Sequence, residues 1–140
     1  MTTSNGSVLP PPGTSITFTK TVSESDVYLY AGITGDFSPN HIDESYMSAG
    51  RYKKRIAHGA LMVGFMSAAA ARLSLGRTVS VGYDRVRFTA PVYFGDTITT
   101  EYTLQSVDLE RGRAQSEVRC TNQDGVLVAT AVHLRAMVDR

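Results

Sequence analysis

Apolar and polar residues alternate along five stretches of this chain, which is the pattern of half-buried β-strands. The stretches cover residues 16–22, 79–90, 98–104, 114–120 and 126–138. The second stretch changes parity at Asp84 and Arg85, which indicates a β-bulge or bend there. The sequences RGR and NQDG separate the last three stretches and predict turns between them. The C-terminal half is therefore expected to form an antiparallel meander.

Parity also predicts which side chains of these strands are buried. In the last stretch the apolar parity comprises Val126, Val128, Thr130, Val132, Leu134, Ala136 and Val138. His133 has the opposite parity and is expected to be exposed. Cys120 shares the face of Ala114 and Val118, so it is expected to be a buried, unreactive thiol rather than a nucleophile.

Between the first two stretches the apolar spacing becomes helical. Ser23 and Asp26 have the spacing of a capping box and Gly35 is a suitable stop, so a helix is expected from residue 23 to residue 35. A shorter helix is expected over residues 41–49.

The segment of residues 59–71 is apolar on all sides apart from Ser67. A bilayer span needs roughly 20 residues, and this segment is shorter. It is therefore expected to be a helix of a soluble protein that is buried on every side.

A strand, then helices, then a meander predict an α+β fold in which a curved antiparallel sheet wraps around one long buried central helix. The hot-dog fold has this arrangement. Residues 14–140 are expected to form this single domain, and residues 1–13, rich in Ser, Thr, Asn, Gly and Pro, a flexible tail. Pairing with a second subunit removes unpaired strand edges, so a homodimer or a higher even oligomer is expected.

Composition narrows the classes of function. The net charge of +1 over 140 residues provides no global field for nucleic acid or for an anionic membrane. The single cysteine excludes an intramolecular disulfide framework, and no basic start followed by an apolar run precedes the domain. These features favour a cytoplasmic protein.

The densest polar chemistry lies in GDFSPNH, residues 35–41. Ser38 and Pro39 favour a turn that brings Asp36 and His41 together. A carboxylate and an imidazole that share one water molecule are a suitable pair for acid–base catalysis. In the alternative interpretation Asp36 only caps the following helix and His41 only packs.

Three sequence blocks, YAGITGDFSPNH, the HG at residues 58–59 and RVRFTAPVYFGDT, together resemble the MaoC-like family of (R)-specific enoyl-CoA hydratases. The resemblance extends from about Ser15 to Val138. Asp36, Ser38, Pro39 and His41 occupy the places of the family signature. The chain departs from it at Ser38, where Asn is commoner, and at Asn40, where an apolar residue is usual, so the polarity around the pair differs.

The resemblance implies a lyase that reversibly hydrates trans-2-enoyl thioesters to (R)-3-hydroxyacyl thioesters. Asp36 and His41 would hold the water, with the roles of acid and base open between them. The amide of Gly59, at a helix start, would stabilise the charge on the thioester oxygen; alternatively Gly59 only allows a tight start to the helix. No metal site and no cofactor beyond the CoA or carrier phosphopantetheine arm of the substrate are implied.

Further residues are candidates for binding the substrate, an acyl-CoA or acyl-carrier-protein thioester. They are Ser38, Asn40, Arg51, Lys53, Lys54 and Arg55. The basic residues of RYKKR suit the phosphates of CoA, or they form a solvated loop. His58 is expected to cap the central helix or to pack.

Two rival functions stay open: a hot-dog acyl-CoA thioesterase, and a non-catalytic acyl-binding hot-dog subunit. The presence of both Asp36 and His41 argues against the non-catalytic subunit. Acyl chain length, branching and the choice between CoA and carrier protein depend on side chains that lie far apart in sequence.

Overall fold

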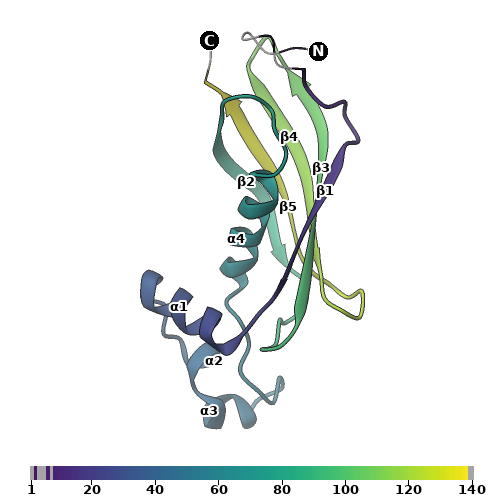
Figure 1. Cartoon of the computed structure of the whole chain (residues 1–140). Coiled ribbons are helices and arrows are strands. Elements are labelled where there is room, and N and C mark those ends of the chain that lie inside the picture. The colour runs from purple at the N-terminus through teal and green to yellow at the C-terminus, as the bar shows by residue number, and fades with distance from the viewer. Residues whose placement is uncertain (1, 3–5, 7, 139–140) are drawn as a thin grey trace.

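A five-stranded antiparallel sheet with one helix across it forms the body of the protein (Figure 1). The computed structural model describes residues 2, 6 and 8–138. The strands are β1 (Ser15–Thr21), β2 (Thr78–Phe88), β3 (Thr97–Asp108), β4 (Arg113–Thr121) and β5 (Leu127–Met137). The helices are α1 (Glu24–Thr34), α2 (Pro39–Ile42), α3 (Glu44–Ser48) and α4 (Gly59–Ala70).

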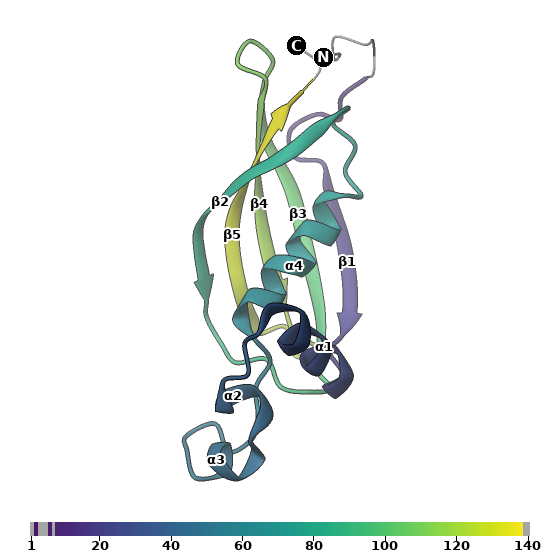
Figure 2. The same ribbon diagram turned by 90° about the vertical axis from the view of Figure 1, so that its left-hand side faces the viewer.

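The strands lie in the order β1-β3-β4-β5-β2, and every neighbouring pair is antiparallel. Figure 2 shows α4 lying across the inner face of the curved sheet, with α1, α2 and α3 grouped at one end. The predicted hot-dog fold is confirmed.

The strands follow the predicted alternation closely in β3 and β4. Ile98, Tyr102 and Leu104 are fully buried, and so is Cys120, where burial raises the pKa of the thiol. The change of parity in β2 is also confirmed. Its register with β5 shifts between Asp84 and Arg87, and Arg85 has a φ of 52°.

The helix after β1 has the predicted ends. Ser23 and Asp26 form both hydrogen bonds of a capping box, and Gly35 ends α1 in the left-handed region with a φ of 84°. The single helix expected over residues 41–49 is wrong, because the chain forms two short helices there. Asp43 is extended and caps α3 by accepting a hydrogen bond from the Tyr46 amide at 2.9 Å, which separates the two.

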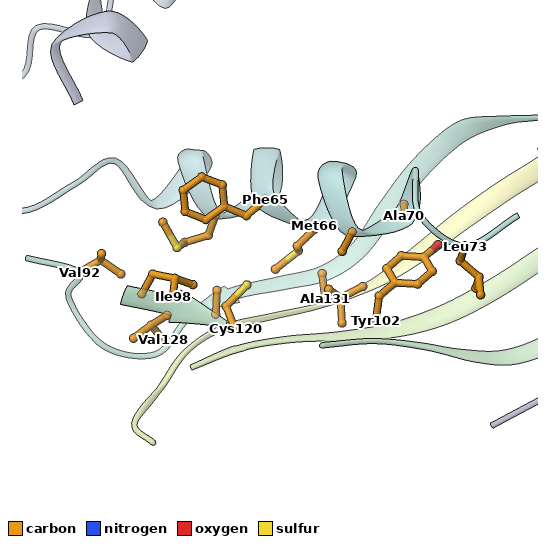
Figure 3. Packing of buried hydrophobic residues seen from close by; sticks show 14 of the residues in the cluster. Phe65, Met66, Ala70, Leu73, Val92, Ile98, Tyr102, Cys120, Val128 and Ala131 are labelled. Atoms are coloured by element: carbon orange, nitrogen blue, oxygen red, sulfur yellow. The ribbon is translucent and has the colours of Figure 1, made fainter. Parts of the chain in front are cut away.

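The core lies between α4 and the sheet. Figure 3 shows Met66 of the helix pointing toward the strands, and Phe65 and Ala70 belong to the same core cluster as Ile98 and Tyr102. Burial of such side chains stabilises the fold by roughly 1.5–3 kcal/mol each.

The expectation that α4 is buried on every side is wrong for the single chain. Ala60, Gly64 and Ser67 are exposed along one side of the helix. The reason is geometric, since one sheet covers only one side of a helix that crosses it.

The expected exposure of His133 is also wrong, because the side chain is only 2% exposed. The inner parity of β5 carries Ala129, Ala131 and His133, while Val132 and Leu134 are half-buried on the outer face. The prediction from hydropathy chose the wrong face of β5, because the inner face carries small alanines and a histidine. Both ring nitrogens of that histidine are hydrogen-bonded. These bonds join Nδ1 to the Tyr102 hydroxyl at 2.6 Å and Nε2 to the Ser80 hydroxyl at 2.8 Å.

We predict that His133 makes the fold sensitive to acid. Burial, aided by the charge of Arg135, lowers the pKa of His133 from 6.5 to about 4. Between these values the unfolded chain binds more protons than the folded chain, so stability is full above about pH 6.5 and falls as the pH drops. The loss reaches about 3 kcal/mol near pH 4, since one pKa unit corresponds to about 1.4 kcal/mol.

Urea unfolding at a series of pH values between 7 and about 4 measures this loss. In His133→Gln the free energy of unfolding should fall less steeply over the same interval, whatever its value at pH 7. Equal slopes in the variant and the wild type would contradict the assignment.

Ordered packing begins before the expected boundary at residue 14. Leu9 is 6% exposed and belongs to the core, and the Gly13 amide donates to the Leu104 carbonyl at 2.7 Å. Residues 1, 3–5 and 7 of the expected tail lie outside the described residues. Within the described part of the chain, no helix has the length and apolar character to cross a membrane.

Candidate active site

The loop between α1 and α2 brings the predicted pair together. Gly35 turns the chain out of α1, and the Asp36 carboxylate then accepts a hydrogen bond from the Ser38 amide at 3.2 Å. Ser38 precedes α2 without a side-chain capping bond. Asp36 thus forms a local turn, and half of its side chain stays exposed.

His41 lies under this loop, and its orientation fixes its chemistry. Its Nδ1 is 2.7 Å from the Ile56 carbonyl, which can only accept, so Nδ1 carries the proton and Nε2 presents a lone pair. Burial lowers the pKa of His41, and the neighbouring His58 lowers it further. The imidazole is therefore neutral at neutral pH, the form in which Nε2 can accept a proton.

Nε2 of His41 and Oδ2 of Asp36 are 4.0 Å apart. This distance is too long for a direct hydrogen bond, but a water molecule about 2.8 Å from each atom spans it. The two side chains therefore converge, as the sequence predicted, and they can share one water.

A pocket of about 370 Å³ opens beside His41 at the start of α4. Its lining includes His41, Gly59, Asn40 and Arg51, together with apolar side chains such as Met62. Asp36 is not part of this lining, and its carboxylate faces the site through the 4.0 Å gap to His41.

Gly59 starts α4, where backbone amides have no intrahelical acceptor and the helix dipole favours negative charge. A β carbon at this position would lie 2.8 Å from Cδ2 of Phe88, so only glycine allows the ring of Phe88 to lie this close. The structure thus places both the amide end of α4 and His41 on one pocket.

Sequence reasoning underestimated His58. The side chain is 1% exposed and packs, and it makes no capping bond to α4 although it occupies the capping position. Its Nε2 donates to the main-chain carbonyl of Asp36 at 2.9 Å, and its ring stacks on that of His41 with 3.7 Å between the centroids. The histidine before Gly59 was the available signal, but only the fold shows its neighbours.

Asp36, His41 and His58 also form the one group in the described part of the chain whose donor atoms lie close enough to hold a metal ion, within 4.8 Å of one another. Nε2 of His58 already donates a hydrogen bond to the Asp36 carbonyl, so in this tautomer it has no lone pair for an ion. This hydrogen bond argues against a metal site and leaves Asp36 and His41 as groups that can exchange protons with a water.

The basic segment divides into two parts. Arg51 lines the pocket, Lys53 is exposed with a φ of 68°, and the Lys54 ammonium lies 4.4 Å from the centre of the Tyr93 ring. Of these three side chains only Arg51 lies on the pocket, and both lysines are exposed.

Arg55 does not belong with them. Its guanidinium bonds Glu44 at 2.7 Å and Glu24 at 3.2 Å, and its side chain is only 17% exposed. It joins α1 and α3 to the loop before α4. Its charge is already neutralised by carboxylates, so the expected contact with a phosphate is not supported.

An antiparallel sheet around a central helix, with a histidine and an aspartate at the amide end of that helix, defines a hot-dog domain with a candidate acid–base site. The comparison with known proteins specifies the family. The chain belongs to the MaoC-like family, because the sequence model described as "MaoC like domain" matches residues 7–126.

Two curated relatives and one solved structure illustrate this membership. The chain is 36% identical over 116 residues to an (R)-specific enoyl-CoA hydratase of Rhodospirillum rubrum, covering 83% of this chain and 81% of the relative. It is 32% identical over 109 residues to a 3-hydroxybutyryl-CoA dehydratase of Methylorubrum extorquens, covering 78% and 69%. The unliganded (R)-hydratase PhaJ1 of Pseudomonas aeruginosa superposes with a TM-score of 0.83 at 31% identity, covering 94% of this chain and 84% of that one.

Proposed function

We propose that this protein is a lyase that reversibly adds water to trans-2-enoyl thioesters and forms (R)-3-hydroxyacyl thioesters. The observation that carries the proposal is the 4.0 Å separation of His41 Nε2 and Asp36 Oδ2 beside a pocket at the amide end of α4. The relatives named as enoyl-CoA hydratase and 3-hydroxybutyryl-CoA dehydratase support it.

The course of the reaction follows from the fact that Asp36 and His41 can each accept a hydrogen bond and a proton. The bound water donates hydrogen bonds to both His41 and Asp36, because both facing atoms are acceptors. As its oxygen bonds to the β carbon, one O–H bond breaks and the pair takes the proton. The π electrons of the double bond move toward the thioester carbonyl, and the α carbon then receives the proton that the pair took from the water.

Charge develops on the thioester oxygen during this step. The amide of Gly59 at the start of α4 supplies a donor that is already oriented, and such donors contribute about 3 kcal/mol to transition-state stabilisation. No cofactor beyond the thioester's own CoA or phosphopantetheine arm takes part.

The arm of the substrate passes the basic residues at the pocket mouth in this proposal. Arg51, which lines the pocket, and the exposed Lys53 and Lys54 bind its phosphates, while Ser38 and Asn40 orient Asp36 or the water. Comparing the KM of crotonyl-CoA with that of the phosphate-free pantetheine thioester tests this; equal values would contradict it.

We also propose a homodimer or a higher even oligomer. β2 is an edge strand, and its Val79, Val81 and Phe88 are 50%, 52% and 54% exposed. An apolar unpaired edge is a surface that a second copy stabilises by pairing. Sedimentation equilibrium measures the mass, and a monomer at micromolar concentration would contradict the assignment.

The lone buried Cys120 favours the cytoplasm as the compartment.

The decisive experiment incubates the protein with crotonyl-CoA and follows both the conjugated enoyl absorbance and free thiol. We expect the absorbance to fall without release of thiol, because water adds to the β carbon. Thiol release would instead identify a thioesterase, in which water attacks the carbonyl carbon. Binding of the thioester with neither change would identify a non-catalytic acyl-binding subunit.

A further inference from the structure

We infer that His58 is a positioning residue for the Asp36–His41 pair, which it holds in place through one hydrogen bond and one ring contact. The inference rests on the proposed function only in naming the pair as the reacting groups. His58 itself lies outside the lining of the pocket, so it does not touch the substrate there.

The hydrogen bond connects two distant parts of the chain. Nε2 of His58 donates to the Asp36 carbonyl at 2.9 Å, and its other nitrogen, Nδ1, is buried without a partner. The ring therefore directs its single hydrogen bond at the loop. Because His58 directly precedes α4, this bond fixes the main chain of Asp36 relative to the helix that carries the Gly59 amide.

The ring contact acts on the other member of the pair. The ring of His58 contacts two other rings, that of Tyr30 with 4.6 Å between centroids and that of His41 with 3.7 Å. A ring stacked on one face of His41 excludes water from that face and keeps the imidazole oriented toward Asp36. This agrees with the lowered pKa of His41, whose largest cause is burial and to which His58 also contributes directly.

Two substitutions separate the two contacts. His58→Phe keeps a ring against His41 and Tyr30 but has no donor for the Asp36 carbonyl. His58→Gln keeps an amide donor but removes the ring. We expect His58→Phe to lower kcat about 10–100-fold with a smaller change in KM, as is typical when a supporting hydrogen bond is lost.

In His58→Gln we expect the pKa of His41 to rise, because water reaches the uncovered face of the imidazole. Titration of the His41 ring protons by NMR measures this shift without any substrate. The acid limb of the kcat/KM profile should move to higher pH by the same amount.

The matched control is Tyr30→Leu, which removes the other ring in contact with His58 and leaves His41 covered. It should lower thermal stability without moving the His41 titration. If His58 had a purely structural role, His58→Gln would also lower thermal stability without moving the His41 titration. An unchanged His41 titration in His58→Gln therefore overturns the inference.

The titration also separates this inference from the proposed function. A wild-type protein that fails to hydrate crotonyl-CoA contradicts the function, while the His41 shift in His58→Gln still decides the role of His58. Should His58→Gln not fold, His58→Asn provides a smaller amide for the same titration.

Discussion

His41→Ala is expected to hydrate crotonyl-CoA about 10²–10⁴-fold more slowly than the wild type, and Asp36→Asn to lose activity to a similar extent. Alanine removes the only lone pair of His41 that faces the water, since Nδ1 is engaged by the Ile56 carbonyl. Asparagine keeps the shape of the Asp36 side chain but cannot take a proton. The pair acts on one water, so the double variant should be little slower than either single variant.

The pH dependence provides a second measurement of the same prediction. His41 acts in its neutral form, and burial lowers its pKa below the ordinary 6.5. The wild-type kcat/KM should therefore stay constant through neutral pH and decline only on the acid side, at a pH below 6.5. A decline that begins above 6.5 would contradict the assignment of His41 as the titrating base.

Asp124→Asn is a matched control for the aspartate, because Asp124 is exposed in the turn between β4 and β5. Its activity should equal that of the wild type. Circular dichroism and thermal melts must show that the His41 and Asp36 variants are folded. Wild-type activity in either folded variant would remove the basis of the proposed mechanism.

Gly59→Ala is expected to lower kcat by about 10²-fold, the size of effect that a displacement of about 1 Å produces near reacting groups. The added methyl group would lie 2.8–2.9 Å from three ring carbons of Phe88, including Cγ, so the ring itself must move. Phe88 lines the pocket, and its displacement also disturbs the start of α4. Steady-state kinetics with crotonyl-CoA measure the loss.

Gly32→Ala is the control for this substitution. Gly32 lies in the exposed part of α1, and no heavy atom lies within 4 Å of an added β carbon. This variant should keep full activity and gain about 0.5–1 kcal/mol in stability from the better helix propensity of alanine.

Adding Phe88→Val to Gly59→Ala should recover part of the activity. A Gly59→Ala single variant as active as the wild type would show that the close contact is unimportant.

Local patterns predicted much of the fold because they report local physical requirements. The capping box of Ser23 and the stop at Gly35 concern the ends of one helix, and both are confirmed. The bulge at Asp84 and Arg85 was visible as a change of parity within one strand. Each of these features depends on neighbours within a few residues.

The errors concern contacts between distant segments. His133 was assigned to the exposed face because the more apolar face of a strand is normally the buried one. In β5 the buried face instead carries small side chains and a histidine whose polar atoms are hydrogen-bonded. Arg55 was grouped with the basic loop because its carboxylate partners, Glu24 and Glu44, lie 31 and 11 residues earlier. The sequence contains all three residues but not their proximity.

The amino-acid sequence by itself determined the strands, both ends of α1 and the motif that carries Asp36 and His41, since these depend on short-range spacing. Only the tertiary structure decided that His58 lies against both members of the pair, that Arg55 is neutralised within the chain, and that α4 exposes one side. These outcomes depend on how the sheet and the loops pack against one another. Such packing is set by shape and by hydrogen bonds between distant residues, and a one-dimensional pattern does not record them.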